Sequence, residues 1–235
     1  IILGLKSTLH ALFVERGVSV FHYNTWAPAL VASYIPPLFG KKVLMQNHGL
    51  EWKRTKYSDK QKKKMKLMEE ISAKTHKHWT LVSQEQTDFF CSEYNRVGVT
   101  IPCAVRIPEE DCKSDILEKY GLKGNDYFLY MGRLVQEKNP LHLIEGFIQS
   151  GISDKKLVIC GNNPHITEYE QSLYEMAKDN TNIIFTGAIF GEDKDVIYRN
   201  CFAFCIPSTL EGLPMSLLEA MSYKKIVLAS DIPSC

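Results

Sequence analysis

From residue 127 to residue 230, short apolar runs alternate with stretches in which apolar residues recur at helical spacing. The apolar runs are YFLYMG, KLVICG, NIIFTG, CFAFCIP and KIVLAS, and the stretches between them are NPLHLIEGF, ITEYEQSLYEMAKD, EDKDVIYRN and PMSLLEAMSY. Continuous apolar strands that alternate with amphipathic helices are typical of a parallel sheet covered on both faces. The pattern therefore predicts a Rossmann-like α/β domain in the second half of the chain.

The first hundred residues show the same alternation less regularly. VSVFHY, KKVLMQ and HWTLVS are strand candidates, and LKSTLHALFVER, APALVASYI and KMKLMEEISAKTHK are helix candidates. The periodicity is lost at IPCAVRIPEED, where two prolines indicate a linker. We therefore predict an incomplete α/β domain at residues 1–107 and a second domain, without its last elements, at residues 108–235.

Composition narrows the class of protein. Hydrophobic residues make up 45% of the chain and charged residues 23%, as in soluble globular proteins. The net charge of +1 and the absence of known motifs argue against nucleic acid as a partner. The seven cysteines form no CxxC pair, which indicates reduced thiols in a cytoplasmic protein. Because the chain begins with Ile and ends just after an apolar run, we expect it to be cut from a longer fold at both ends.

Two basic residues follow the first strand of the second domain. Sheets of this kind bind ligands at the carboxyl ends of their strands. Arg133 and Lys138 lie between the YFLYMG strand and the next helix, where a guanidinium fork and an ammonium group can neutralise a diphosphate. The alternative is a pair of solvated cations, although cations are disfavoured at a helix N-terminus.

Two carboxylates follow the CFAFCIP strand. Glu211 ends the loop, Pro214 is placed to begin the next helix, and Glu219 lies within that helix. Free backbone amides at residues 212–216 suit an anion or a hydroxyl, and two carboxylates can accept hydrogen bonds from two sets of sugar hydroxyls. Taken singly, Glu211 could equally be a capping carboxylate and Glu219 a surface residue. Their combination with the two upstream cations favours ligand binding.

The segments GRLVQEKN and PSTLEGLPMSLLEAMSYKKIVLAS resemble the retaining glycosyltransferase family 4, or glycosyl transferases group 1. Its GT-B fold has two Rossmann-like parallel-sheet domains that face a cleft, and this chain is expected to be a truncated α/β protein of that type. The family's signature of two glutamates separated by seven residues matches Glu211 and Glu219. The resemblance implies that Arg133 and Lys138 hold the donor diphosphate, that Glu219 binds the ribose, and that Glu211 contacts the transferred sugar.

The resemblance also implies a wider donor site, in which backbone groups just after Gly187 meet the base. The expected donor-binding residues are Gly132, Gly161, Asn162, Gly187, Ala188, Ile189, Gly212, Leu213, Pro214, Met215, Ser216 and Glu219. The expected catalytic residues are His48, Arg133, Lys138 and Glu211. The implied substrate is a nucleotide-diphosphate sugar such as a UDP-, GDP- or dTDP-sugar, with no further cofactor. No metal is expected, in agreement with the lack of a DxD motif near a strand end.

The N-terminal half carries a weaker resemblance through FHYNTWAPAL and MQNHGLEWKRTKYS, which are similar to bacterial transferases that build surface polysaccharides. It implies that His48 lies near the donor sugar. The expected acceptor-side residues are His22, Asn24, Asn47, Glu51 and Trp52. From the residues alone, His48 could be a satisfied loop histidine, and Trp52 could stack on a sugar or cover the core.

Lysines and arginine are dense between Lys53 and Lys66, where Asp59 is the single acidic residue. Such a segment can contact anionic lipid headgroups at the inner face of a membrane, or it can be a solvated face. Membrane contact would suit a lipid-linked acceptor.

The sequence departs from the family at one turn, and two functions other than sugar transfer remain open. The family's Asn-Gly-Val-Asp turn is replaced by Cys103, Ala104, Val105 and Arg106, which changes the preferred turn geometry. A sugar-nucleotide epimerase of the same fold, or a non-catalytic binding module, remains an alternative. Because terminal elements are expected to be missing, we predict weak or no sugar transfer by these residues alone.

Overall fold

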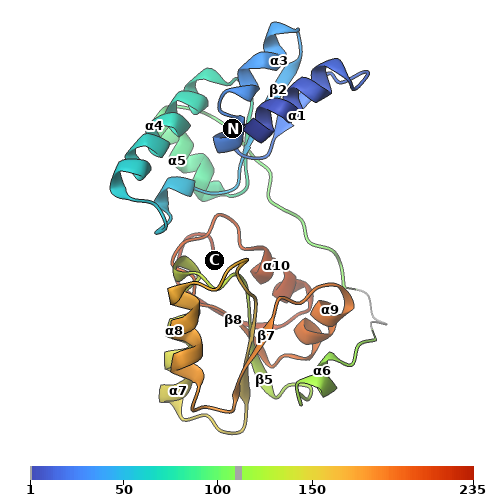
Figure 1. Ribbon diagram of the computed structural model, residues 1–235, viewed down its shortest axis with the longest axis vertical. Helices are drawn as coiled ribbons and strands as arrows, with labels where there is room; N and C mark the ends of the chain where they lie inside the picture. Colours follow the sequence, from blue (N-terminus) through green and yellow to red (C-terminus); the bar gives the residue numbers. More distant parts are fainter. Residues whose placement is uncertain (1, 109–112) are drawn as a thin grey trace. The chain divides into compact units, whose positions relative to one another are not determined.

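The computed structural model describes residues 2–108 and 113–235, which form two compact units, Ile1–Cys103 and Ala104–Pro233 (Figure 1). The sequence places the division slightly later, between residues 107 and 108. Glu109 to Asp111 of the expected linker, together with Cys112, lie outside the described residues. Each unit has its own parallel sheet and its own hydrophobic core.

The N-terminal unit contains a four-stranded parallel sheet in the order β1-β2-β3-β4. Its strands are β1 (Val20–Tyr23), β2 (Lys42–Asn47), β3 (Trp79–Leu81) and β4 (Val99–Thr100). Its helices include α1 (Ile2–Phe13), α4 (Asp59–Thr75) and α5 (Gln84–Tyr94). The three strands expected from the sequence are confirmed. The pattern missed β4, which has only two residues, and α5.

Two helices of this unit differ from the sequence prediction. APALVASYI is not one helix but is divided among α2 (Trp26–Ala29), η1 (Ala32–Tyr34) and α3 (Ile35–Leu38). Two prolines follow the segment in the first turn of α3, where proline is tolerated because amides of the first turn have no partner within the helix. Helix α4 begins earlier than expected. Its start is fixed by a capping box, in which the amide of Ser58 donates to Gln61 Oε1 at 2.9 Å and the amide of Gln61 donates to Ser58 Oγ at 3.4 Å.

A buried carboxylate lies in the core of the N-terminal unit. Glu69 of α4 accepts hydrogen bonds from the indole nitrogens of Trp26 and Trp52, both at 3.0 Å, and from the hydroxyl of Tyr94 at 2.9 Å. Burial raises the pKa of Glu69, although the three donors act in the opposite direction. The carboxylate therefore ties α4 to three other segments of this unit.

The C-terminal unit contains a five-stranded sheet in the order β7-β6-β5-β8-β9, with every pair parallel. The strands are β5 (Tyr127–Met131), β6 (Lys156–Cys160), β7 (Ile183–Gly187), β8 (Ala203–Ile206) and β9 (Ile226–Ala229). All five were expected from the sequence. The chain moves outward from β5 to β7 and then returns to place β8 on the other side of β5, so the strand order reverses between β5 and β8.

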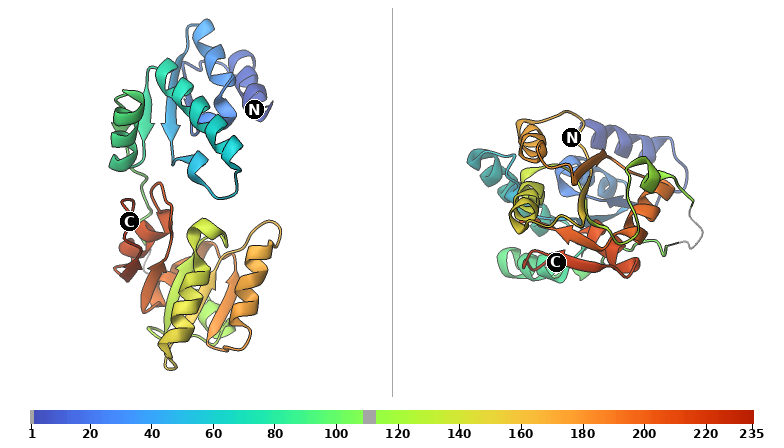
Figure 2. Two further views of the ribbon diagram at one scale, coloured as in Figure 1. Left: turned by 90° about the vertical axis from the view of Figure 1, so that its left-hand side faces the viewer. Right: turned by 90° about the horizontal axis from the view of Figure 1, so that it is seen from below.

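Helices cover both faces of this sheet because successive strand residues point to opposite sides. On one face, α7 (Pro140–Ser150) and α8 (Glu168–Ala177) pack side by side, as both views of the molecule show (Figure 2). On the other face lie α6 (Ile116–Lys119), α9 (Gly191–Asn200) and α10 (Met215–Ser222). Within the described residues, no helix is both long and apolar enough to span a membrane.

Candidate functional site

The loops that follow β5 and β8 meet at the point where the strand order reverses. Between them lies a hollow of about 370 Å³. Nine residues expected to bind or activate the donor line it: Gly132, Arg133, Lys138, Glu211, Leu213, Pro214, Met215, Ser216 and Glu219. All four charged residues of the described lining were therefore expected from the sequence, because parallel strands bring their carboxyl ends to one edge.

The loop after β5 is held by its own backbone. The amide of Gly132 donates to the carbonyl of Cys160 at 3.0 Å, and the hydroxyl of Tyr130 donates to the carbonyl of Arg133 at 2.8 Å. The short helix η3 (Gln136–Lys138) follows and presents Lys138 to the hollow. Arg133 is exposed at the same edge.

Lys138 and Glu211 form an ion pair inside the hollow. The Lys138 Nζ lies 2.5 Å from Glu211 Oε1 and 2.6 Å from Oε2. The hydroxyl of Ser208 donates to Oε1 at 2.7 Å, and the amide of Thr209 donates to the carbonyl of Glu137 at 2.9 Å. The Glu211 side chain is only 7% exposed. These bonds join the loop after β8 to η3 and hold one cation and one carboxylate side by side.

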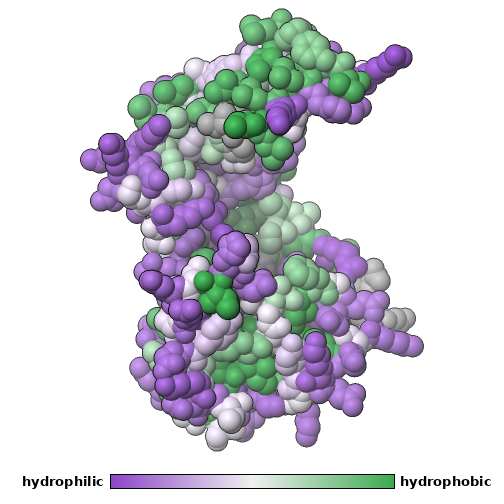
Figure 3. Space-filling view, viewed as in Figure 1, coloured by the Kyte–Doolittle hydropathy of each residue, from purple (hydrophilic) through white to green (hydrophobic). Residues whose placement is uncertain are grey.

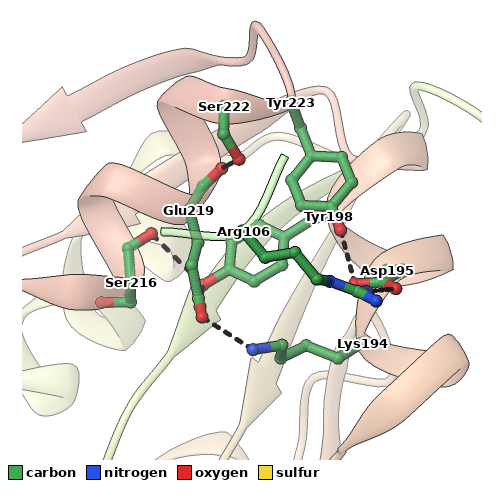
Figure 4. A network of polar contacts seen from close by, with 8 residues as sticks. All are labelled: Arg106, Lys194, Asp195, Tyr198, Ser216, Glu219, Ser222 and Tyr223. Carbon is green, nitrogen blue, oxygen red and sulfur yellow. Dashed lines mark hydrogen bonds and ion pairs between the residues drawn. The ribbon is translucent and has the colours of Figure 1, made fainter. Parts of the chain in front are cut away.

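Glu219 lies on α10 at the other end of the hollow and is held from α9 (Figure 4). Lys194 Nζ donates to Glu219 Oε1 at 2.7 Å, and the Tyr198 hydroxyl lies 3.2 Å from Glu219 Oε2. Pro214 is the N-cap of α10, close to the first position predicted for it, and Leu213 to Ser216 at the start of this helix line the same hollow as Glu211.

A second polar hollow of about 270 Å³ adjoins Glu219. Its lining includes Arg106 and Asp195, which form an ion pair, and Tyr223, whose hydroxyl donates to Asp195 Oδ1 at 2.5 Å. The rings of Tyr198 and Tyr223 are stacked, with centroids 5.4 Å apart. Arg106, which replaces the Asp of the family turn, is therefore anchored on α9.

Four residues of the site were not expected from the sequence: Lys194, Asp195, Tyr198 and Tyr223. Helical spacing could have found Lys194 and Tyr198, since residues four apart lie on one face of a helix. Their partner Glu219 belongs to a different helix, so the contact itself could not be read from local spacing.

Six expected donor residues do not belong to the described lining of the first hollow: Gly161, Asn162, Gly187, Ala188, Ile189 and Gly212. Gly161 packs directly against the loop that follows β5. Its φ of +151° and its close approach to the carbonyl of Gly132 leave no room for a side chain. Its amide donates to the carbonyl of Gly187 at 2.8 Å. Ile189 packs against the core, and Asn162 and Ala188 are exposed.

In the N-terminal unit, four expected acceptor-side or catalytic residues lie at or near the ends of neighbouring strands. His22 and Asn24 are in or just after β1, and Asn47 and His48 are at the end of β2. Asn47 is buried and its side-chain nitrogen has no hydrogen-bond partner. Partial burial and the neighbouring His22 both lower the pKa of His48.

Glu51 and Trp52 have partners within the same unit. Glu51 lies 2.6 Å from Arg54 Nε and 3.0 Å from Lys56 Nζ, and the Tyr57 hydroxyl donates to it at 3.0 Å. Burial alone would raise the pKa of Glu51, but these cations and the hydroxyl outweigh it and lower the pKa. Trp52 packs against the core and donates to Glu69, so of its two expected roles the structure shows core packing.

The described part of the chain contains no cluster of metal-ligating residues and no disulfide. No group of three or more His, Cys, Asp or Glu residues there is arranged to hold a metal ion. The described cysteines are free thiols, and burial raises the pKa of Cys160 and Cys205 to about 12 and that of Cys201 to about 11. These three thiols are core residues.

Two parallel-sheet α/β units of this kind define the GT-B fold, which the solved structures similar to this chain share. Sucrose-phosphate synthase from Thermosynechococcus elongatus aligns with a TM-score of 0.77 at 20% identity, over 97% of this chain and 59% of that one. Anabaena Alr3699/HepE, in complex with UDP and glucose, aligns with a TM-score of 0.79 at 15% identity, over 99% of this chain and 64% of that one. The expected fold class is confirmed.

The sequence profile of the family described as Glycosyl transferases group 1 matches residues 113–235, more than half of the chain. The chain belongs to this family. It is 27% identical over 176 residues to the O-antigen chain mannosyltransferase RfbU of Salmonella typhimurium, which covers 74% of this chain and 47% of that protein. It is 30% identical over 126 residues to an Escherichia coli UDP-Gal:alpha-D-GlcNAc-diphosphoundecaprenol alpha-1,3-galactosyltransferase, over 51% of this chain and 32% of that protein. The chain thus spans less than half the length of these relatives.

Proposed function

We propose that the chain is part of a retaining glycosyltransferase that moves a hexosyl or deoxyhexosyl group from a nucleotide-diphosphate sugar to a saccharide or lipid-linked acceptor in cell-surface polysaccharide synthesis. The observation that carries this proposal is that one hollow contains Arg133, the Lys138–Glu211 ion pair and Glu219. The names of similar proteins support it, since one is an O-antigen mannosyltransferase and another acts on a diphosphoundecaprenol-linked sugar.

The charges of the hollow suggest how the transfer proceeds. Arg133 and Lys138 stabilise the negative charge that develops on the leaving diphosphate, which is a dominant kind of catalytic effect. Glu211, fixed by Lys138 and Ser208, accepts a hydrogen bond from the transferred sugar. The departing phosphate takes the proton of the acceptor hydroxyl on the same face of the sugar, so that the configuration is retained. The proposal needs no cofactor besides the donor.

His48 and its neighbours are proposed to serve the acceptor side. The lowered pKa of His48 favours the neutral imidazole, which can both donate and accept a hydrogen bond. Asn47 contributes a buried amide group without a partner at the end of the same strand. Glu51 is committed to its cations, and we therefore assign it to shaping the loop.

The experiment is calorimetric titration of the chain with UDP, GDP, ADP and dTDP. We expect at least one nucleotide to bind, and Glu219→Ala to weaken it, whereas the matched exposed variant Glu175→Ala leaves it unchanged. A failure of all four nucleotides to bind would refute the donor site. Incubation with the sugar form of the best nucleotide, followed by product analysis, separates the alternatives: an epimerised sugar supports the epimerase, and binding without any chemistry even with added lipid-linked saccharides supports the binding module.

We also propose that the protein works at the cytoplasmic face of a membrane, with α4 as the contact. Within the Lys53–Lys66 segment, Arg54 and Lys56 are paired with Glu51, and Lys66 is paired with Glu93. Lys60, Lys63 and Lys64 are exposed on α4, and Leu67 and Ile71, which are 55% and 47% exposed, continue the same face at helical spacing. Figure 3 shows hydrophilic residues gathered over the end of the unit that contains the start of α4.

Vesicle binding tests this contact. The triple variant of Lys60, Lys63 and Lys64 to Gln should bind phosphatidylglycerol-containing vesicles roughly 100-fold less well, since each lysine near the surface contributes about 1 kcal/mol. The control variant, Lys113, Lys123 and Lys178 to Gln, carries the same charge change on the other unit. Equal binding of both variants would contradict the assignment to α4.

A further inference from the structure

The backbone carbonyl groups of Arg133 and Leu134 are each held by a side chain from elsewhere in the C-terminal unit. The Arg133 carbonyl accepts from the Tyr130 hydroxyl at 2.8 Å and from the amide of Val135 at 3.0 Å. The Leu134 carbonyl accepts from Asn163 Nδ2 at 2.8 Å. Two successive peptide groups that follow Arg133 are therefore fixed, although the Arg133 side chain itself is exposed.

Asn163 lies in the loop between β6 and α8, and its amide nitrogen bridges two acceptors. Nδ2 lies 2.8 Å from the Leu134 carbonyl oxygen and 2.9 Å from Glu170 Oε2. A carboxamide nitrogen carries two hydrogens, so it can donate one to each partner. Because a backbone carbonyl and a carboxylate only accept, the nitrogen of the amide and not its oxygen must face them. The Asn163 side chain is therefore held in one orientation.

Glu170 provides the fixed support for this amide. It lies in the first turn of α8 and is only 2% exposed, and its backbone amide donates to Thr167 Oγ1 at 3.1 Å. Its Oε1 accepts from the Tyr174 hydroxyl at 2.9 Å, so each carboxylate oxygen has one donor. Burial and the neighbouring Glu170 raise the pKa of Tyr174 to about 12, so the hydroxyl stays protonated and donates. A carboxylate buried in this way needs such donors, because an unpaired buried charge is costly.

A fixed backbone matters at Arg133 because its side chain is long and flexible. The guanidinium can reach the hollow only from the place where its own backbone holds it, and ordering a flexible side chain costs conformational entropy. Holding the backbone in advance lowers the cost of placing the guanidinium against a ligand. The link from Glu170 through Asn163 to Leu134 does this from α8, although none of the described residues of α8 lines the hollow.

We propose that Asn163 and Glu170 are positioning residues, which fix the Leu134 carbonyl and thereby hold Arg133 where its guanidinium meets the second phosphate of the donor. This inference rests on the proposed function, which assigns a nucleotide diphosphate to the hollow. Neither residue contacts the nucleotide. Their effect is confined to the part of the affinity that the second phosphate contributes, and α8 becomes a determinant of donor recognition.

The test compares a nucleoside diphosphate with its monophosphate. Calorimetry measures both dissociation constants for the nucleotide that binds most tightly among UDP, GDP, ADP and dTDP, and their ratio reports the contribution of the second phosphate. Arg133→Met should reduce the preference for the diphosphate. Asn163→Ala and Glu170→Ala should each reduce it about 3- to 10-fold, because a displaced guanidinium loses part of a charge-assisted hydrogen bond.

Two further variants separate geometry from charge. Glu170→Gln should keep the preference within about twofold of the wild type, because the new amide oxygen still accepts from Asn163 and the new NH₂ group can donate to the Tyr174 hydroxyl oxygen. Glu168→Ala is the matched control, since Glu168 is exposed in the same turn of α8, and it should match the wild type. Asn163→Ala and Glu170→Ala break one link from opposite ends, so either variant suffices if the other does not fold.

The ratio distinguishes positioning from a structural effect. A variant that only loosens the fold weakens both nucleotides equally, and an unchanged ratio in Asn163→Ala would overturn the inference. In the Arg133→Met background, Asn163→Ala should leave the ratio unchanged, and a further reduction of the same size would also overturn it. If the wild type binds both nucleotides equally well, this inference alone fails; if it binds neither, the proposed function fails with it.

Discussion

Lys138 and Glu211 stand 73 residues apart in the chain, and the ammonium group of one lies within 2.6 Å of both carboxylate oxygens of the other. The pair bridges the loops that follow β5 and β8, on either side of the point where the strand order reverses. It brings a cation and a hydrogen-bond acceptor to one place, which under the proposed function serve the diphosphate and the transferred sugar.

Removing either partner of this pair alone should destabilise the C-terminal unit, and the two losses should not be additive. Lys138→Met leaves Glu211 buried without its cation, and Glu211→Gln leaves Lys138 without its anion, so each should destabilise the C-terminal unit by about 1–3 kcal/mol. The double variant should lose less than the sum of the two single losses. Urea unfolding followed by circular dichroism measures the free energies of unfolding.

The exposed pair Lys178–Glu175 provides a matched control for this cycle. Because exposed pairs contribute little, Lys178→Met and Glu175→Gln should leave the free energy of unfolding nearly unchanged. Additive losses at Lys138 and Glu211 would show that the two residues do not stabilise each other.

Gly161→Ala should damage the site without altering any charged residue. An added Cβ would lie 1.8 Å from the carbonyl oxygen of Gly132, and the φ of +151° is unfavourable for alanine. Displacement of the loop after β5 should destabilise the unit by about 1–3 kcal/mol and weaken nucleotide binding. Gly146→Ala is the contrasting control, because its Cβ would meet nothing within 4 Å and α7 should become more stable by about 0.5–1 kcal/mol. Unimpaired nucleotide binding by Gly161→Ala would show that this close approach does not shape the site.

The sequence predicted the C-terminal unit well because its local signals agree. Apolar runs stopped by Gly132, Gly161 and Gly187 became β5, β6 and β7, and the topology of a parallel sheet then placed Arg133, Lys138 and Glu211 at one edge. The resemblance to a family added a proposed role for each charge. Side-chain pairing was not predictable in this way, because it depends on contacts between segments that are far apart in the chain.

The N-terminal unit shows more clearly that side-chain partners cannot be predicted from local sequence. From the sequence Trp52 could stack on a sugar or cover the core, and its hydrogen bond to Glu69 of α4 accompanies core packing in the structure. A glutamate in a lysine-rich helix gives no local sign that it will be buried beneath two indoles. Likewise, Arg106 was visible only as a departure from the family turn, whereas its partner Asp195 lies 89 residues away.

Glu69→Gln should destabilise the N-terminal unit through one unpaired donor. The amide oxygen of Gln can replace Oε1, which accepts from Trp52 and Tyr94, but its NH₂ group would then face the indole N–H of Trp26. The expected loss is about 1–3 kcal/mol. All three tryptophans, Trp26, Trp52 and Trp79, belong to this unit, so urea unfolding followed by tryptophan fluorescence reports on it selectively.

A second substitution identifies the cause of that loss. Trp26→Phe removes the indole N–H that would face the amide group introduced by Glu69→Gln. It should therefore lower the free energy of unfolding less in the Glu69→Gln background than in the wild type. Glu70→Gln, on the neighbouring position of α4, should have little effect because Glu70 pairs with Lys74 near the surface. Equal costs of Trp26→Phe in both backgrounds would contradict the proposed donor conflict.

The stability of the N-terminal unit should fall as the pH is lowered below the ordinary histidine pKa of about 6.5. Burial lowers the pKa of His76, although its backbone hydrogen bonds at Ser72 and Ser33 act in the opposite direction. The folded state therefore binds a proton less readily than the unfolded state, so this contribution to stability is complete above the unfolded pKa and is lost as the pH falls through the folded one. Urea unfolding by tryptophan fluorescence at pH 7.5 and pH 5.5 measures the loss. His76→Phe should reduce the difference between the two pH values, with His142→Phe on the other unit as the control, and an undiminished difference in His76→Phe would assign the acid sensitivity to other groups.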